Sequence, residues 1–153
     1  MTGRTAALLV APSAIALGFV LLAVRMHVEP PTIPPYTIAP GATTELRPGD
    51  QFSLALEPAG ILTGAVAAHA FLVQGDHVRP WAPEFLVDRD GTIHVGGAVS
   101  TLFAGVPPGE WELTIAIGRP ETLPTTATDV LRAHTDGGAA AWMVLRERVW
   151  LRG

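Results

Sequence analysis

The longest apolar stretch of the sequence runs from Thr5 to Val24, contains no charged residue and is bounded by Arg4 and Arg25. About 20 helical residues, at 1.5 Å rise each, match the roughly 30 Å hydrocarbon core of a bilayer. The pattern therefore predicts one N-terminal transmembrane helix within residues 1–25. The residues expected to form the span are Leu8, Leu9, Val10, Pro12, Ile15, Leu17, Phe19, Leu21 and Leu22.

The flanks of this apolar run favour an uncleaved anchor over a cleaved signal peptide. The run is longer than a usual signal-peptide core, and Leu21-Leu22-Ala23-Val24 is a poor cleavage site. Ala16-Leu17-Gly18 is a weaker, internal candidate that keeps the cleaved alternative open. One arginine lies on each side, so the charge rule is nearly balanced. A short N-tail followed by a folded domain is typical of a signal anchor, which predicts a bacterial inner-membrane protein with a periplasmic C-terminal domain.

Residues 26–40 are rich in proline and predict a stalk. Proline fixes φ and favours an extended polyproline II chain of about 3.1 Å per residue. Glu29 to Pro40 would then hold the following domain roughly 30 Å from the bilayer. Pro31 and Pro34 have the spacing of a PxxP ligand, but the stiff stalk is the favoured interpretation.

Residues 41–153 show short period-2 runs that are separated by turns, which is typical of β-strands. Two further patches have a helical pattern: Val99 to Phe103 is expected to form one turn, and Ala127 to His134 a short surface helix. The predicted fold is mainly β, an antiparallel β-sandwich of six to eight strands. The predicted strands are Gln51 to Glu57, Val66 to Val73, Glu84 to Val87, Thr92 to Val95, Glu110 to Ile117 and Ala141 to Leu151.

The last predicted strand carries two different faces. Its apolar face contains Met143, Leu145, Val149 and Leu151, whereas the other face alternates arginine and tryptophan. Such an open face would suit a partner protein. Trp150 covering the edge of a sheet is the competing interpretation. The candidate partner surface comprises Trp81, Arg146, Arg148 and Trp150.

Two of these expectations concern single tryptophans. Trp81 lies in a connection that is bracketed by Pro80 and Pro83, where exposure is expected. Trp111 alternates with polar residues in the clearest strand of the chain and is expected in the core.

A local motif supports the sandwich. Val106-Pro107-Pro108-Gly109 is followed at once by Glu110-Trp111-Glu112-Leu113. This segment resembles one that is common in Ig-like and transthyretin-like extracytoplasmic domains, where a Pro-Gly turn feeds a central strand and its aromatic enters the core. The resemblance implies the fold and no activity.

A looser resemblance extends from Leu46 to Pro124. It is similar to the C-terminal domains of myxobacterial membrane proteins that are described as anti-sigma-factor-like. Those proteins usually carry a cytoplasmic zinc finger before the span. Only four residues precede the span here and the chain has no cysteine, so sigma-factor binding does not transfer.

Composition narrows the chemistry further. The formal net charge is −4 and no basic face is visible, so nucleic acid is not an expected partner. The absence of cysteine excludes disulfides, thiolate nucleophiles and cysteine metal sites. Asp88 and Asp90 resemble the start of a calcium loop, but Thr92 and Val99 stand where further oxygen ligands are needed. The segment is therefore interpreted as a hairpin turn.

The histidines show no metal-binding spacing. They are His27, His69, His77, His94 and His134. His69 is expected on a sheet face and His94 on the polar side of its strand. A metal site built in space from His77, His94 and carboxylates, or a Ser-His-Asp triad, stays open as an alternative. No catalytic residue, metal or cofactor is predicted.

These patterns together favour a non-enzymatic interaction or accessory module that is presented outside a membrane. The expected partners are membrane lipid and another protein of the membrane or envelope. The alternatives are an exported ligand-binding or enzymatic domain with a non-local site, and an envelope sensor of the anti-sigma-like type.

Overall fold

The structure is a computed structural model that describes residues 32–41, 44–132 and 141–153. The predicted span from Thr5 to Val24 lies outside these residues. Within the three described ranges, no helix has the length and apolar character that crossing a membrane requires.

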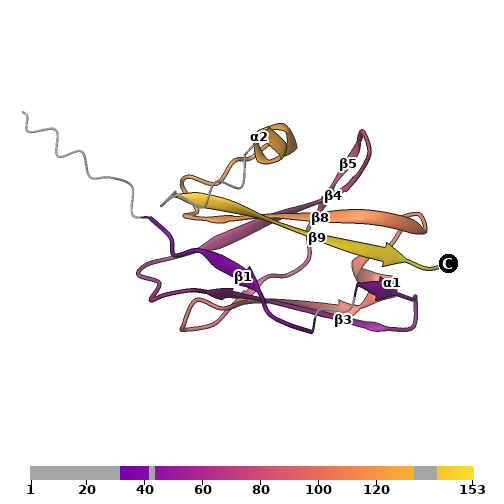
Figure 1. Cartoon of the computed structure of the whole chain (residues 1–153), viewed down its shortest axis with the longest axis horizontal. Coiled ribbons are helices and arrows are strands. Elements are labelled where there is room, and N and C mark those ends of the chain that lie inside the picture. Colours follow the sequence, from indigo (N-terminus) through magenta and orange to yellow (C-terminus); the bar gives the residue numbers. More distant parts are fainter. Residues whose placement is uncertain (1–31, 42–43, 133–140) are drawn as a thin grey trace, which may run out of the picture.

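Two packed sheets form a mainly β, sandwich-like domain, as predicted (Figure 1). Every strand pair among the described residues is antiparallel except β2 with β9, which is parallel. The four-stranded sheet has the order β1 (Tyr36–Ile38), β3 (Gln51–Pro58), β7 (Ile93–Ala98) and β6 (Leu86–Val87). The five-stranded sheet has the order β2 (Glu45–Leu46), β9 (Trp142–Leu151), β8 (Gly109–Gly118), β4 (Ala67–Gln74) and β5 (His77–Trp81).

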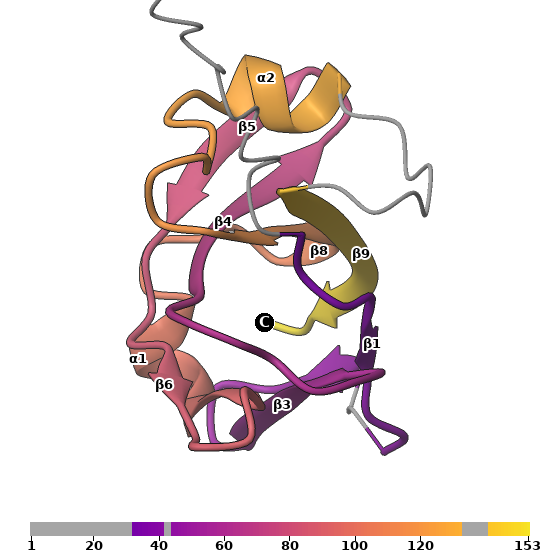
Figure 2. The same ribbon diagram turned by 90° about the vertical axis from the view of Figure 1, so that its left-hand side faces the viewer.

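Two short helices accompany the sheets. Helix α1 (Val99–Leu102) links the two sheets, and α2 (Ala127–Arg132) lies outside the five-stranded sheet (Figure 2). Under α2, the outward-facing Phe71, Ala116 and Val144 are buried in a second, smaller apolar cluster. Only part of the outward face of this sheet therefore meets solvent.

The alternating pattern of β8 fixes which side of the sheet each residue occupies. Trp111, Leu113 and Ile115 are buried between the sheets, while Glu110 and Glu112 point outward. This is the expected consequence of the period of two along a strand. The prediction that Trp111 belongs to the core is confirmed, since its side chain is 4% exposed.

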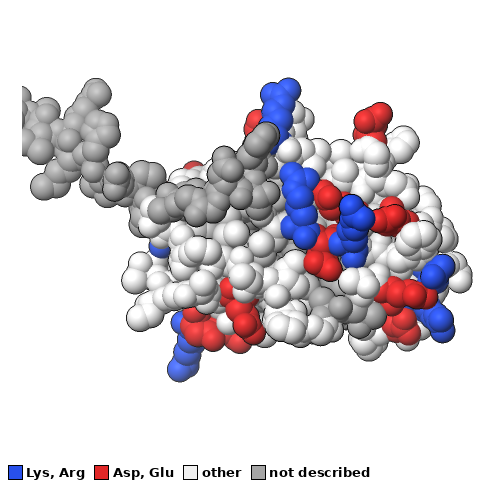
Figure 3. Space-filling view, viewed as in Figure 1, with Lys and Arg blue, Asp and Glu red and all other residues white. Residues whose placement is uncertain are grey.

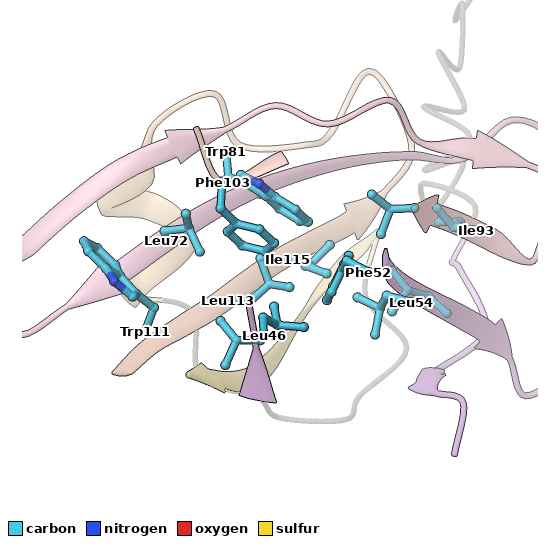
Figure 4. Packing of buried hydrophobic residues seen from close by; sticks show 14 of the residues in the cluster. Leu46, Phe52, Leu54, Leu72, Trp81, Ile93, Phe103, Trp111, Leu113 and Ile115 are labelled. Carbon is cyan, nitrogen blue, oxygen red and sulfur yellow. The ribbon is translucent and has the colours of Figure 1, made fainter. Parts of the chain in front are cut away.

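An aromatic cluster fills the core beside α1 (Figure 4). Phe52 packs edge-on against Trp81 and Phe103, with ring centroids 6.0 and 5.5 Å away. Trp81 and Phe103 stack with their centroids 5.3 Å apart. Such pairs stabilise a core beyond the area they bury.

The expectation that Trp81 is exposed is wrong. Trp81 ends β5, faces the small Ala70 across the β4–β5 pair and is 5% exposed. Its Nε1 donates a hydrogen bond to the Leu102 carbonyl at 2.8 Å, so the polar edge of the ring is satisfied inside. Pro80 is tolerated because β5 is an edge strand, where a missing N–H costs no ladder bond.

The predicted hairpin around residues 88–91 is confirmed. Strands β6 and β7 pair through Val87 and Ile93. The Asp88 N–H donates to the Thr92 carbonyl at 2.8 Å, and Gly91 takes a φ of 91° that favours glycine. Both predicted helical patches also appear, as α1 and α2, although His134 lies outside the described residues.

Part of the range predicted as a stalk, residues 26–40, belongs to the folded domain, and residues 26–31 lie outside the described residues. Ile33 and Tyr36 are 6% and 2% exposed and belong to the main core, and β1 begins at Tyr36. An apolar side chain that loses its water on folding stabilises the domain, so these positions serve as core and not as spacer. The folded domain therefore begins by Ile33.

Candidate interaction surface

The outward face of β8 and β9 carries the arginine and tryptophan residues that the sequence singled out. Charged side chains of both signs gather over these strands in Figure 3. Arg146, Arg148 and Trp150 are exposed and share this face, since the alternate residues Val149 and Leu151 are buried. Across the strand pair, Arg148 lies opposite Glu112 and Trp150 lies opposite Glu110. The structure thus brings together three of the four predicted surface residues.

Two ion pairs cross diagonally between the strands. Arg146 Nη1 lies 2.7 Å from Glu112 Oε1, and Arg148 Nη1 lies 3.6 Å from Glu110 Oε1. The first pair is about one-third exposed, whereas the Arg148 side chain is 82% exposed. Exposed pairs contribute little to stability, so Arg148 is available to exchange its partner.

Arg146 forms contacts that stabilise the fold. Besides Glu112, its guanidinium donates to the Leu131 carbonyl in α2 at 3.3 Å. Glu112 also accepts a hydrogen bond from the Thr114 hydroxyl at 3.2 Å. The network holds α2 against the sheet, so Arg146 differs in role from Arg148 although both stand on the same strand face.

Trp150 remains 43% exposed at the junction of β2, β9 and β8. The Arg152 guanidinium lies 5.1 Å from the ring centroid, a cation–π distance. Arg152 Nε also donates to Glu45 Oε1 at 3.0 Å. These contacts fix an aromatic side chain at the surface while leaving much of its area open to a partner.

A shallow hollow lies beside this group. It has a volume of about 530 Å³ and is lined by Val73, Gln74 and Gly75 together with Glu110, Trp111, Glu112 and Arg148. Val78 faces Val73 across the β4–β5 pair and is 36% exposed. The surface thus combines apolar area with charges of both signs at its border. Interfaces between proteins have this composition.

The histidines are dispersed. His69 Nδ1 lies 3.3 Å from the Pro124 carbonyl oxygen, and His94 Nε2 lies 3.0 Å from Asp88 Oδ2. His77 stands in β5, in the sheet opposite to that of His94. Among the described residues, no group of three or more His, Asp or Glu side chains lies close enough to hold a metal ion. His27 and His134 lie outside those residues.

Sequence reasoning missed several members of the surface. The sequence did carry a signal for Glu110 and Glu112, because the period of two in β8 places both on its outward side. Val78 and Arg152 gave no such signal, because their places depend on the strand pairing and on a contact with Trp150.

Comparisons with known proteins do not assign a family. They found no protein-family model that matches this sequence and no curated protein that is significantly similar to it.

Proposed function

We propose that this chain is a single-pass, membrane-anchored bacterial protein that presents an Ig-like β-sandwich as a non-enzymatic interaction module. The apolar run from Thr5 to Val24 supports the anchor, because its length and lack of charge suit a membrane span. The proposed position of the domain is the periplasm.

The order of the strands supports the Ig-like assignment. The order β1-β3-β7-β6 corresponds to strands A, B, E and D of an immunoglobulin sandwich. The order β9-β8-β4-β5 corresponds to G, F, C and the additional C′ strand of variable-type domains. The resemblance of residues 106–113 to the turn before a central strand of such domains agrees with this correspondence.

One observation carries the proposed interaction: Trp150 is held half-exposed by Arg152, next to the weakly paired Arg148 and a shallow hollow. Tryptophan and arginine are enriched among the residues that dominate binding energy. Ordering Trp150 before binding also reduces the entropy that a partner must remove. The proposed partner is another protein of the membrane or envelope.

Site-specific photo-crosslinking in the native membrane tests this proposal. A benzophenone side chain replaces Trp150 in the full chain, and in a matched variant it replaces Ser53. Ser53 is exposed on the outward face of the opposite sheet, so both substitutions leave the core intact. We expect a discrete crosslinked protein from position 150 and none from position 53.

A charge-reversal variant makes the crosslinking experiment more specific. Arg148→Glu should abolish the adduct at position 150, because it reverses a charge on the same face without touching the core. An adduct of equal yield from both positions, or none from position 150, would show that the proposed surface does not bind a protein.

A further inference from the structure

The connection between β3 and β4 presents an uncharged tip at the end of the domain where the described chain begins. Residues 59–66 read Ala-Gly-Ile-Leu-Thr-Gly-Ala-Val. Tyr36 pairs with Pro58, the last residue of β3, so this loop follows directly at the end that contains Ile33. Ile61 is 93% exposed, the highest value among the large apolar residues that the structure describes as exposed.

The loop is held in place on three sides. The Ala59 N–H donates to the Pro35 carbonyl at 2.7 Å, and Arg119 Nη1 donates to the Ala65 carbonyl at 2.8 Å. Leu62 packs closely on Gly91, where an added Cβ would lie 2.8 Å from its Cδ2. Ile61 is therefore kept outward by an anchored backbone, while its neighbour Leu62 turns toward the domain.

The length of the connecting chain places this end close to the apolar run. From Val24 to Thr32 there are eight residue steps, which span at most about 29 Å when fully extended. If the run spans a bilayer, the end of the sandwich that carries the loop lies within that distance of the membrane. The opposite end carries α1, since Ala98 pairs with Gln51 at the other end of β3.

The charge distribution favours the same orientation. In Figure 3 the leftmost part of the surface is largely uncharged, while acidic and basic side chains gather below it, at the lower left, and over the middle and right of this view. Glu57, Arg89 and Asp90 border a shallow hollow behind Ile61. These charged groups stay hydrated, so only the tip of the loop suits the boundary between headgroups and acyl chains.

We propose that the loop of residues 59–66 docks on the lipid bilayer, with Ile61 inserted at the interface, and so orients the sandwich on its membrane. The proposal rests on the proposed membrane anchor and adds a second contact to it. Two membrane contacts at one end would hold the Trp150 face sideways, parallel to the membrane normal and open to a laterally placed partner.

Single-cysteine labelling of the full chain tests this, because the protein has no cysteine of its own. Ile61→Cys and Ala104→Cys each receive an environment-sensitive fluorophore, and the protein is placed in phosphatidylcholine–phosphatidylglycerol vesicles. Ala104 is an exposed loop residue that follows α1 at the opposite end. Vesicle flotation is measured on the same samples, so that anchoring is read independently.

We expect both variants to float, and the label at position 61 alone to shift to the blue. Lipid-attached nitroxide should quench that label several-fold more than the label at position 104, and aqueous iodide should quench it less. Flotation with equal quenching at the two positions would overturn loop docking and leave the anchor standing. Failure to float would overturn the anchor and the docking together.

Discussion

Tyr36 joins the start of the domain to a distant turn. Its hydroxyl donates to the Gly91 carbonyl at 2.9 Å, and the ring is 2% exposed. Burial raises the pKa of the Tyr36 phenol above its ordinary value of 10.0, because the phenolate would lose its hydration. The nearby Arg119 opposes this rise and Asp90 adds to it.

The buried hydroxyl predicts a specific loss of stability on substitution. Tyr36→Phe should lower the free energy of unfolding by about 1 kcal/mol, since it leaves the Gly91 carbonyl without its donor. Chemical denaturation at neutral pH measures the loss. An unchanged midpoint and slope would show that the hydrogen bond contributes nothing.

The raised pKa of Tyr36 also predicts an alkaline transition. In the unfolded chain the phenol ionises near pH 10, whereas in the folded chain it stays protonated to higher pH. The contribution of Tyr36 to the free energy of unfolding is therefore fully present below pH 10. It is lost as the pH rises through the pKa of the folded state. The chain has one tyrosine, no cysteine and no lysine, so this transition should be absent in Tyr36→Phe. An equal alkaline decline in both proteins would exclude Tyr36 as its source.

At the scale of elements, Arg146 fastens α2 to the outward face of the sheet. Arg146→Met should cost about 1 kcal/mol, because it removes a half-buried ion pair and the bond to Leu131. Amide hydrogen exchange in α2 should accelerate with it. Arg148→Met is the matched control on the same strand face, and its exposed pair predicts no change in α2. Equal exchange in the two variants would mean that Arg146 does not hold the helix.

Within the described parts of the chain, strand β9 has a partly open edge. The Trp150 N–H donates to the Thr44 carbonyl, away from β8, so the alternate residues Val144, Arg146 and Arg148 also direct their backbone groups away from β8. Strand β2 pairs only with Trp150 and Leu151. Such an edge can template pairing with another chain.

Glu147 protects this edge. It stands opposite the buried Leu113, on the inward side of β9, and no described residue forms an ion pair with it. An inward-pointing charge on an edge strand makes pairing with a second strand costly. Glu147→Val should therefore promote self-association, measured by sedimentation over a range of concentrations. Arg148→Val, which adds the same side chain outward, should stay monomeric under the same conditions; association of both or neither would refute the role of Glu147.

Sequence reasoning succeeded where an element is long and periodic. Strands β8 and β9 each span 10 residues, and their alternation placed Arg146, Arg148 and Trp150 on one outward face. Strands β1 and β2 have 3 and 2 residues, too few for a periodic signal, and were not predicted. The burial of Trp81 depends on pairing with Ala70, which local sequence does not reveal. The hydrogen bond from Arg146 to the Leu131 carbonyl in α2 is likewise a tertiary contact that local sequence does not reveal.

At the scale of the whole molecule, the proposed anchor would make the domain one part of a membrane-bound unit. The fold begins by Ile33, so few residues separate it from the apolar run. If the run is an anchor, as proposed, one end of the sandwich lies near the bilayer. The exposed Ile61 lies at that end, and the Trp150 face runs along the side. The anchor is thus the claim on which the proposed orientation and the proposed partner both depend.

Membrane fractionation of the full chain in its native cells tests this claim most directly. We expect the full-length protein to sediment with the membranes, to resist extraction by alkaline carbonate and to float with lipid after detergent-free lysis. External protease should reach the domain only after the outer envelope is opened. A folded, full-length protein in the soluble periplasmic or cytosolic fraction would contradict the account.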